Sequence, residues 1–427
     1  MATDKESGAR VRFGLVSWSD ILWLTAISST LLLTLLPFSS YIVSVPFVRD
    51  EWSMNNTEAA VVFSAYLVGS ALSAVFLLPV TDRVPARKVL LASIVVMAVA
   101  NVLFPLLARD IWTASLLRCA AGAGHVGAYI PGVRLVSLRF AGSMRGTAVG
   151  TFVSIGFVGT TGSYAFTGLL LDLTDSWRTA YLITSLVGLV GVAIALWVVR
   201  DRRSDEDMTN SPRSWGPDLR ILKGGSILLL NLAYALHTAE LYLARLWLPL
   251  LLVAALMESG REPGEAAVIA ATWAGLMFMS GSVGVFLGGM LSDRLGRTAG
   301  AGVIFAVSGA VSFVVGWLLG APLIVLIALG FVYGFATAAD SAIYSTAATE
   351  LAPANRIGST QGVQNFIGFT VGAIAPILAG GILDIVEGAA GWGLAFGFNG
   401  LLAVAGLVSL WMLRRHPDAS EMAEGRR

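Results

Sequence analysis

Residues 179–199 read TAYLITSLVGLVGVAIALWVV, a run of apolar and small side chains that contains no charged residue. A transmembrane helix needs about 20 such residues to cross the hydrocarbon core of a bilayer. The stretch VLLASIVVMAVANVLFPLL at 89–107 has the same character. Because a helix satisfies its own backbone hydrogen bonds, it is a form in which such runs cross lipid. The sequence therefore predicts an all-α integral membrane protein.

The composition of the whole chain favours the same class. Of its 427 residues, 56% are hydrophobic and 13% are charged, whereas a soluble domain is about 25% charged. A net charge of +1 offers no basic surface to a nucleic acid. Cys119 is the only cysteine, so no disulfide framework and no cysteine-based metal site are expected. We expect the lipid bilayer as the chain's environment, with neither nucleic acid nor metal as a partner.

Long apolar runs recur about twelve times, in two sets of six. The longest polar stretch of the chain, RDRRSDEDMTNSPRSWGPDLRILKGG, separates the two sets. We expect a six-helix bundle in residues 1–200, a cytoplasmic linker at 201–223, and a second six-helix bundle with a cytoplasmic tail in residues 224–427. The expected spans are 21–47, 58–80, 89–108, 112–138, 147–171 and 179–199, followed by 225–256, 266–291, 299–320, 322–348, 359–383 and 392–413.

Lysine and arginine are distributed unevenly between the connecting loops. With a cytoplasmic N-terminus, 22 of the 28 basic residues lie on the cytoplasmic side, as the positive-inside rule requires. Four lie outside and two, Arg118 and Arg245, lie within the membrane. This distribution predicts a multi-pass protein of the cell membrane with both termini in the cytoplasm.

The two halves repeat one another. Four short segments of the first half have counterparts in the same order in the second half, which indicates a parallel duplication related by an axis along the membrane normal. The matching pairs are TEAAVVFSAYLVG (57–69) with GEAAVIAATWAGL (264–276), TDRVPARK (81–88) with SDRLGRTA (292–299), RGTAVG (145–150) with RIGSTQG (356–362), and TGLLLD (167–172) with AGGILD (379–384).

These motifs resemble those of the major facilitator superfamily of secondary transporters, across nearly the full length of the chain. The segment GGMLSDRLGR (288–297) is similar to that family's loop signature, G-x-x-x-D-R-x-G-R, and LLRCAAGAG (116–124) is similar to its fourth-span motif, with Arg118 as the arginine. The first-half copy of the loop, LPVTDRVPARK (78–88), keeps Asp82 and Arg83 but has Leu78 and Pro85 at the glycine positions.

The resemblance implies alternating access by two rigid six-helix bundles. The chain shares the general character of the cyanate- and anion-permease branch. Its fifth span reads GFVGTTGSYAFTG and lacks the Gly-Pro antiporter motif of the family, which puts drug/proton antiport in doubt.

The charged loop residues are candidates for gating. Each carboxylate lies at the cytoplasmic end of a span, close to arginines, so it can hold one access state through an ion pair or a helix N-terminus and release it in the other. The alternative role is a simple positive-inside anchor. The candidate gating residues are Asp82, Arg83, Arg87, Asp293, Arg294 and Arg297.

The seventh span contains ALHTAELYLARLWLPLLL (235–252), with three ionisable side chains inside an apolar helix. Such a group near the bilayer centre costs about 3 kcal/mol by insertion scales. At 100° per residue, Tyr234, His237 and Arg245 lie on one arc, and Glu240 lies about 60° from the edge of that arc. We expect the arc to face a central aqueous cavity as a substrate or proton site. The alternative is a static salt bridge between helices.

Other spans add further candidates. Asp340 in the tenth span is an acid well inside the membrane, where burial disfavours its charge, so it can carry a proton; the alternative is a hydrogen-bonded structural aspartate. Arg118 offers two donors to a carboxylate or oxyanion, or packs against another helix. In the eleventh span, Gln364 and Asn365 share a face that could line the pathway.

Together these features predict an ion-coupled, specifically proton-coupled, secondary transporter of a small anionic solute. Three histidines make no metal cluster, and no GK[ST] loop supports ATP-driven transport, so neither a cofactor nor an obligate protein partner is expected. The alternatives are a proton-coupled exporter of drug-like or metabolite molecules, a channel and a membrane enzyme. The expected substrate-binding residues are Arg118, Arg245, His237, Tyr234, Asn365 and Gln364, and the expected proton carriers are Glu240 and Asp340.

Overall fold

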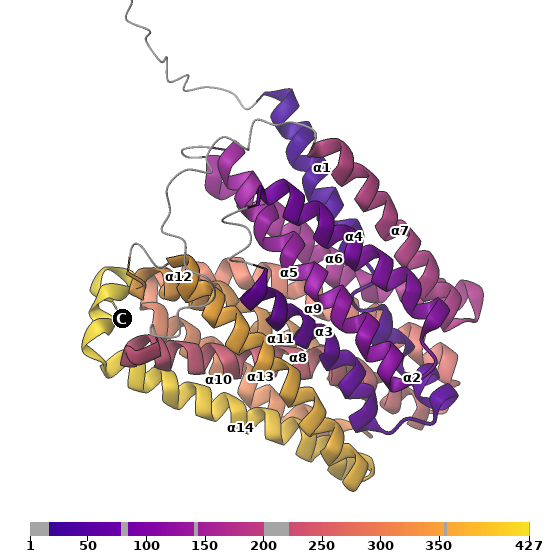
Figure 1. Ribbon diagram of the computed structural model, residues 1–427. Coiled ribbons are helices and arrows are strands. Elements are labelled where there is room, and N and C mark those ends of the chain that lie inside the picture. Colours follow the sequence, from indigo (N-terminus) through magenta and orange to yellow (C-terminus); the bar gives the residue numbers. More distant parts are fainter. Residues whose placement is uncertain (1–16, 78–83, 141–143, 200–221, 354–356, 427) are drawn as a thin grey trace, which may run out of the picture.

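The computed structural model describes residues 17–77, 84–140, 144–199, 222–353 and 357–426, and within these ranges the chain forms helices and no strand (Figure 1). We call residues 17–199 the first half and residues 222–426 the second half. The first half contains α1 (Trp18–Leu35), α2 (Ser40–Trp52), α3 (Asn56–Phe76), α4 (Ala86–Leu107), α5 (Ile111–Arg139), α6 (Met144–Thr174) and α7 (Trp177–Val198). The second half contains α8 (Gly225–Glu258), α9 (Pro263–Leu295), α10 (Arg297–Val315), η4 (Gly316–Leu318), α11 (Leu323–Ala339), α12 (Ser341–Leu351), α13 (Ile357–Ile385), α14 (Gly388–Arg415) and η5 (Pro417–Gly425).

The helices confirm a multi-pass membrane protein. Ten segments of the described ranges are long and apolar enough to cross a bilayer. The predicted fourth and fifth spans coincide with α5 and α6, which have 29 and 31 residues but are not among the ten. The all-helical fold is therefore confirmed, whereas the count of twelve spans stays a prediction. Most of the predicted linker at 201–223 lies outside the described residues.

Two of the long apolar segments are broken near the middle of the molecule. A turn at 36–39 separates α1 from α2 and contains Pro37, which has no backbone N–H to continue the hydrogen bonds of the helix. The Ser39 amide donates to the Ser163 hydroxyl at 3.0 Å, and the Ser39 hydroxyl donates to the Thr160 carbonyl at 2.9 Å. The second break, at Asp340, separates α11 from α12. Both breaks leave polar groups facing the interior.

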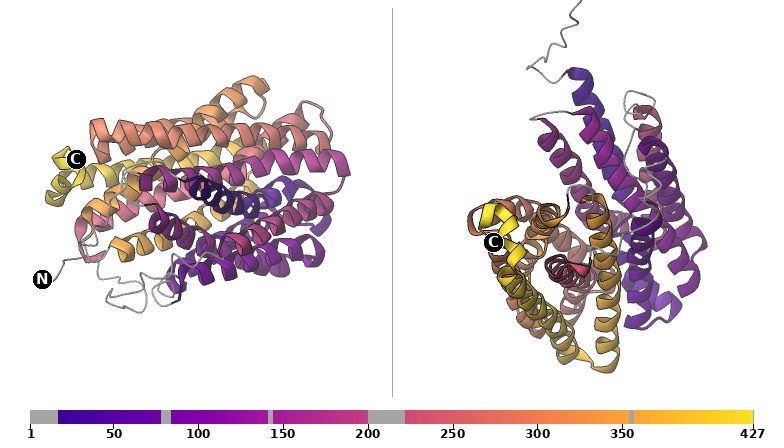
Figure 2. Two further views of the ribbon diagram at one scale, coloured as in Figure 1. Left: turned by 90° about the horizontal axis from the view of Figure 1, so that it is seen from above. Right: turned by 60° about the vertical axis from the view of Figure 1, so that its left-hand side comes forward.

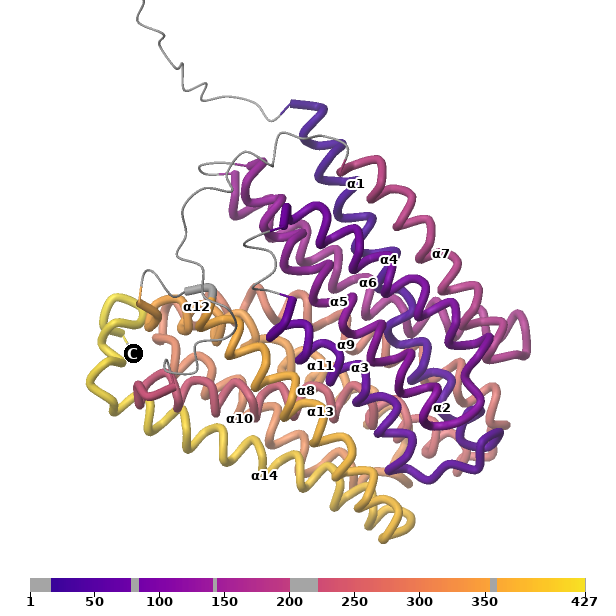
Figure 3. Tube along the Cα trace, viewed as in Figure 1, coloured from indigo at the N-terminus to yellow at the C-terminus, as the bar shows by residue number. Residues whose placement is uncertain are grey.

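The two halves form a wedge. They pack against each other along α3 with α13 and along α6 with α9. In Figures 1 and 3 they meet near α2 and diverge towards the beginning of α6 and the end of α12, and Figure 2 shows the same two halves from other directions. We call the end near Trp52, Asn56 and Pro263 the converging side, and the end near Met144 and Leu351 the diverging side.

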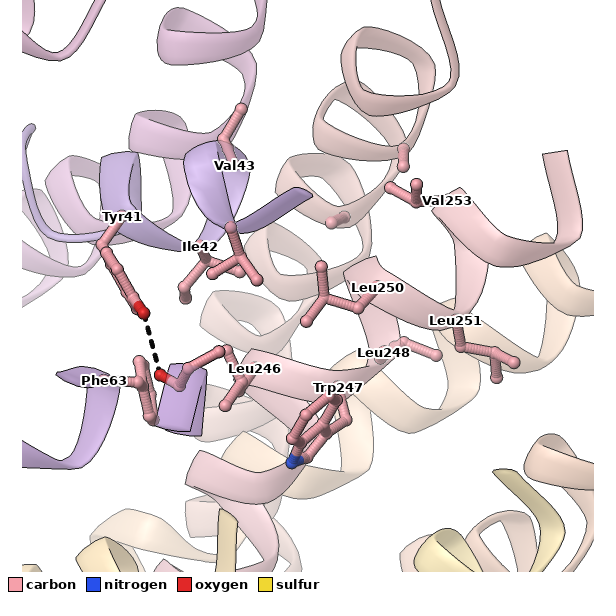
Figure 4. Close-up of a cluster of buried hydrophobic side chains, with 14 of the residues drawn as sticks. Tyr41, Ile42, Val43, Phe63, Leu246, Trp247, Leu248, Leu250, Leu251 and Val253 are labelled. Carbon is pink, nitrogen blue, oxygen red and sulfur yellow. Dashed lines mark hydrogen bonds between the residues drawn. The ribbon is translucent and has the colours of Figure 1, made fainter. Parts of the chain in front are cut away.

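An apolar cluster closes the converging side. Ile42 and Val43 of α2 belong to the same cluster of buried side chains as Leu250 and Val253 of α8, so the two halves share one core there (Figure 4). The Tyr41 hydroxyl donates to the Ala59 carbonyl oxygen at 2.9 Å, which ties α2 to α3. Because these side chains are buried, separating the halves at this end would expose apolar surface.

Close contact between helices within the second half depends on small residues. A Cβ atom at Gly288 of α9 would lie 2.0 Å from the backbone oxygen of Ala339, at the end of α11. A Cβ atom at the neighbouring Gly289 would meet no heavy atom within 4 Å. The two glycines therefore differ in packing although both lie on the same helix.

We predict that Gly288→Ala lowers the midpoint of thermal unfolding of the purified protein in detergent. The methyl group would force α9 and α11 apart, and overpacking of this kind costs about 1–3 kcal/mol, which exceeds the roughly 1 kcal/mol that alanine gains in helix propensity. Gly289→Ala is the matched control and should leave the midpoint unchanged or raise it. Equal midpoints for the two variants would contradict the packing described for α9 and α11.

Candidate functional site

Arg245 lies at the junction of the two halves. Its guanidinium carbon is 5.6 Å from the ring centre of Phe38, 5.4 Å from that of Phe157 and 5.8 Å from that of Tyr242. Phe38 and Phe157 belong to the first half, whereas Arg245 and Tyr242 belong to α8. The side chain is buried, yet no carboxylate of the described residues forms an ion pair with it. Three aromatic faces are thus its neighbours, and they compensate only part of the cost of desolvating a cation.

Half-buried side chains extend this site on both halves. His125 of α5 lies beside Phe38, with ring centres 6.4 Å apart, and Tyr129 follows one turn later on the same helix. On the other half, the Tyr234 hydroxyl donates to the Asn365 side-chain oxygen at 3.3 Å. We call the following residues the central site: Phe38, His125, Tyr129, Phe157, Tyr234, Tyr242, Arg245, Asn365 and Phe369.

Arg118 is a second buried cation without a carboxylate partner among the described residues. Its Nη1 atom donates to the Phe38 carbonyl oxygen at 3.4 Å and to the Tyr181 hydroxyl at 3.5 Å. Its guanidinium carbon lies 4.7 Å from the ring centre of Tyr66 and 5.4 Å from that of Tyr41. The Nε and Nη2 atoms have no partner among the described residues. Phe38 therefore contacts both arginines, through its backbone oxygen and through its ring.

His237 turns into the second half, away from Arg245. Its Nδ1 atom lies 3.0 Å from an Asp340 carboxylate oxygen, and its Nε2 atom lies 3.1 Å from the Ser341 hydroxyl. Both ionisable side chains are buried, at 2% and 1% exposure. The Tyr344 ring stacks near His237, with centres 5.1 Å apart. The arc predicted for the seventh span is thus divided: Tyr234 and Arg245 are part of the central site, whereas His237 contacts the break between α11 and α12.

Glu240, one turn after His237, is held by hydroxyl groups. Its carboxylate accepts hydrogen bonds from Ser308 at 2.9 Å and from Ser312 at 3.2 Å, both on α10. Ser312 is also 2.7 Å from the Tyr333 hydroxyl, which continues the polar chain. We call Glu240, Asp340 and His237 the acid cluster. Among the described residues no arginine or lysine pairs with it.

Two glutamines of α13 point away from the central site. The Gln364 amide donates to the Tyr344 carbonyl oxygen at 3.4 Å, inside the second half. The Gln361 amide donates to the Thr349 hydroxyl at 3.1 Å. Of the predicted residues on this helix, the structure therefore brings only Asn365 together with Tyr234 and its neighbours.

The loop motif of the second half forms a compact ion-pair group at the diverging side. Arg297 lies 2.6 Å from an Asp293 oxygen and 2.8 Å from a Glu350 oxygen of α12. Glu350 also accepts from the Ala423 backbone amide of η5 at 3.2 Å. All four groups belong to the second half. Glu350 was not among the sequence candidates, since nothing in its local sequence shows that α12 ends beside α10.

The remaining gating candidates are placed as follows. Arg294 is exposed, and Arg87 is half-buried near the start of α4. Asp82 and Arg83 lie outside the described residues, so the structure does not place the first-half copy of the motif.

Asp384, which the sequence predictions missed, joins the two halves at the converging side. One carboxylate oxygen accepts a hydrogen bond from the Asn56 backbone N–H at 2.7 Å. The other accepts hydrogen bonds from the Thr57 backbone N–H at 2.9 Å and from the Thr57 hydroxyl at 2.6 Å. The carboxylate of α13 thus caps the N-terminus of α3, where a negative charge is stabilised. Asp384 thus forms a polar link between the two halves, although it lies 328 positions after Asn56 in the sequence.

The internal repeat keeps an aspartate at the position equivalent to Asp384 but lacks the hydrogen-bond donors that Asp384 uses. The repeats align Asp384 with Asp172, and Asn56–Thr57 with Pro263–Gly264. Proline has no backbone N–H and glycine has no hydroxyl, so the start of α9 cannot offer the same three donors. Asp172 is accordingly exposed. The repeat TGLLLD/AGGILD was the available signal, but its partner could not be read from the sequence.

Membrane-crossing helices in two packed halves, with charged groups buried at their junction, are the architecture expected of a secondary transporter. The family model described as Major Facilitator Superfamily matches residues 27–376 and 230–427. Since the first match alone covers more than half of the chain, the protein belongs to the major facilitator superfamily. It is a secondary transporter, as the sequence resemblance predicted.

Two relatives and one solved structure illustrate this membership. The chain is 23% identical to the hexuronate transporter of Bacillus subtilis (strain 168) over 81% of this chain and 84% of the relative. It is 27% identical to the 3-(3-hydroxy-phenyl)propionate transporter of Escherichia coli (strain K12) over 86% and 88%. A bacterial homologue of the human lysosomal transporter Spinster, solved in an inward-facing and occupied conformation, matches with a TM-score of 0.67 at 17% identity, covering 94% of this chain and 96% of that chain.

We predict that Asp384→Asn loosens the converging side. The amide has half the acceptors and places its own N–H groups against backbone donors, and hydrogen bonds to a charged group contribute about 1.5–3 kcal/mol. Spin labels at Arg109→Cys and Glu387→Cys, on opposite halves, with Cys119→Ala in the background, should report a larger fraction of long distances. Asp172→Asn is the matched control and should leave the distance distribution unchanged. No change in either variant would contradict a locking role for Asp384.

Proposed function

We propose that the protein is a proton-coupled secondary transporter that moves a small organic anion across the cell membrane by alternating access. The observation that carries this proposal is Arg245, a buried guanidinium between the two halves with no carboxylate among the described residues as its partner. The mobile units are the bundles in residues 1–200 and 224–427, joined by a cytoplasmic linker at 201–223.

Arg245 is the proposed anchor for the anion. A guanidinium keeps its charge when buried and binds a carboxylate with two parallel hydrogen bonds. Tyr234 and Asn365, hydrogen-bonded to each other about three turns from Arg245 along α8, are proposed to line the path of the solute to this anchor. Arg118 lies behind Phe38 and adds positive potential. The two named relatives carry carboxylate-bearing solutes, which supports an anion as the cargo of this chain.

The acid cluster is the proposed carrier of the coupling proton. Glu240 and Asp340 are buried within the second half with His237 as the sole ionisable base beside them among the described residues. An acid in this setting holds a proton, because a charge inside the membrane costs several kcal/mol. His237, on α8, contacts the break between α11 and α12, and it can pass the proton on when α8 moves relative to that break. Gln364, hydrogen-bonded to the Tyr344 backbone, supports this region from α13.

The diverging side is the proposed cytoplasmic side, following the distribution of basic residues. The conformation described is then open inwards, with the Asp384 link and the apolar cluster of α2 and α8 closing the outside. Asp293, Arg297 and Glu350, with Arg294 and the first-half residues Asp82, Arg83 and Arg87, are the proposed latch that closes the cytoplasmic side in the opposite state.

The test uses purified protein in liposomes loaded with a pH-sensitive dye and challenged with a panel of organic anions and cationic drugs. We expect an anion to drive proton entry, and Arg245→Gln to abolish both proton and solute movement. Proton movement driven by cationic drugs alone would instead favour the exporter of drug-like molecules. Solute flux without any proton movement would contradict proton coupling.

Neutral replacements in the acid cluster separate coupling from binding. We predict that Glu240→Gln and Asp340→Asn lose solute-driven proton movement while retaining exchange of labelled for unlabelled solute, because a permanently neutral side chain mimics the protonated state. Glu262→Gln, at the exposed start of α9, is the matched control and should behave as wild type. Normal proton movement in both cluster variants would mean that these acids are structural.

A further inference from the structure

The cation of the central site is surrounded by aromatic rings from both halves. We infer that the anion carried by this transporter is an aromatic carboxylate, whose acid group binds Arg245 and whose ring lies among Phe157, Tyr242 and Phe369. This inference rests on the proposed function and names the substrate class of the same site. It goes beyond a generic organic anion, since sugar acids and sulfonates would need a different lining.

The geometry around Arg245 favours a planar apolar group next to an anion. Phe38, Phe157 and Tyr242 lie 5.4–5.8 Å from the guanidinium carbon, and Phe369 extends the same wall 6.2 Å from Tyr242. Aromatic rings prefer offset or edge-to-face partners at centroid separations of about 4.5–7 Å. A solute ring attached to a carboxylate at Arg245 would find such partners on both halves at once.

The hydroxyl group beside Arg245 is already engaged within the protein. The Tyr164 hydroxyl donates to the Arg245 backbone oxygen at 2.8 Å. Each hydroxyl of a sugar acid needs its own partner once it leaves water, since an unpaired buried hydroxyl is costly. The central site therefore suits an aromatic carboxylate better than a polyhydroxylated one.

Both halves contribute to the aromatic lining, which links recognition to transport. Phe38 follows Pro37 in the turn between α1 and α2, and Phe157 lies on α6, so a ring bound between them and Tyr242 contacts both moving units. A ligand that binds both halves stabilises the state in which they come together around it. A small aliphatic acid would reach Arg245 but would lose these stacking contacts.

The test compares solutes that differ only in the ring. Benzoate and cyclohexanecarboxylate have the same carboxylate and the same carbon skeleton, but only benzoate is aromatic. In liposomes with a pH dye, after subtraction of the proton entry that each acid causes in protein-free liposomes by diffusion of its neutral form, we expect benzoate or phenylacetate to drive proton entry at concentrations at least tenfold lower than cyclohexanecarboxylate or glucuronate. Benzyl alcohol, which lacks the charge, should not drive it. Equal potency of benzoate and cyclohexanecarboxylate, or a preference for glucuronate, would overturn the inference while the proposed function stands.

Two variants test whether Phe157 and Tyr242 are responsible for the preference for an aromatic ring. Phe157→Leu and Tyr242→Leu should reduce the ratio of benzoate to cyclohexanecarboxylate potency at least threefold each, while the midpoint of thermal unfolding confirms that they fold. Phe286→Leu is the matched control, because its ring is 68% exposed on the outer face of α9. An unchanged ratio in both site variants would overturn the assignment of the ring site. Failure of every carboxylate to move protons with wild-type protein would refute the proposed function itself, and the inference with it.

Discussion

A guanidinium buried between two helical bundles needs a negative partner, and Arg245 has none among the described residues. Its nearest acidic neighbour along the helix, Glu240, lies five residues earlier and therefore about 140° around α8. That carboxylate is held instead by Ser308 and Ser312 inside the second half. Positive and negative charges are thus segregated on one helix. Paired charges would form a static salt bridge. Because the charges are apart, the proposed mechanism assigns the cation to the solute and the acids to the proton.

The Arg245 site and the acid cluster also differ in which halves of the protein contribute to them. The site of Arg245 includes Phe38 and Phe157 from the first half, whereas the acid cluster is assembled within the second half at the α11–α12 break. A change in how the two halves meet would alter the site of Arg245 directly. It would alter the acid cluster through α8, which carries Arg245 as well as His237 and Glu240. The Asp384 cap on α3 holds the halves together at the converging side. In the proposed alternating-access cycle, these hydrogen bonds would break when the converging side opens.

The helical architecture was accessible from the sequence because it follows from apolar run length. The seventh span, expected at 225–256, is observed as Gly225–Glu258, which begins where the polar stretch ends. The breaks at Pro37 and Asp340 and the partners of the charged groups were not accessible. A helical wheel gives the direction of His237 but not its neighbour, and the contact of Asp384 with Asn56 spans 328 residues. Arg245 was a candidate from the sequence because ionisable side chains inside an apolar helix are themselves a signal.

The most direct measurement is a structure of the protein bound to a transported carboxylate that carries a heavy halogen, such as 4-iodobenzoate. The account predicts the carboxylate within about 3 Å of the Arg245 guanidinium nitrogens, the distance of a charged hydrogen bond, with the iodine-bearing ring among Phe157, Tyr242 and Phe369. A carboxylate bound at Arg118 or in the acid cluster, or an Arg245 paired with a carboxylate of the protein itself, would contradict it.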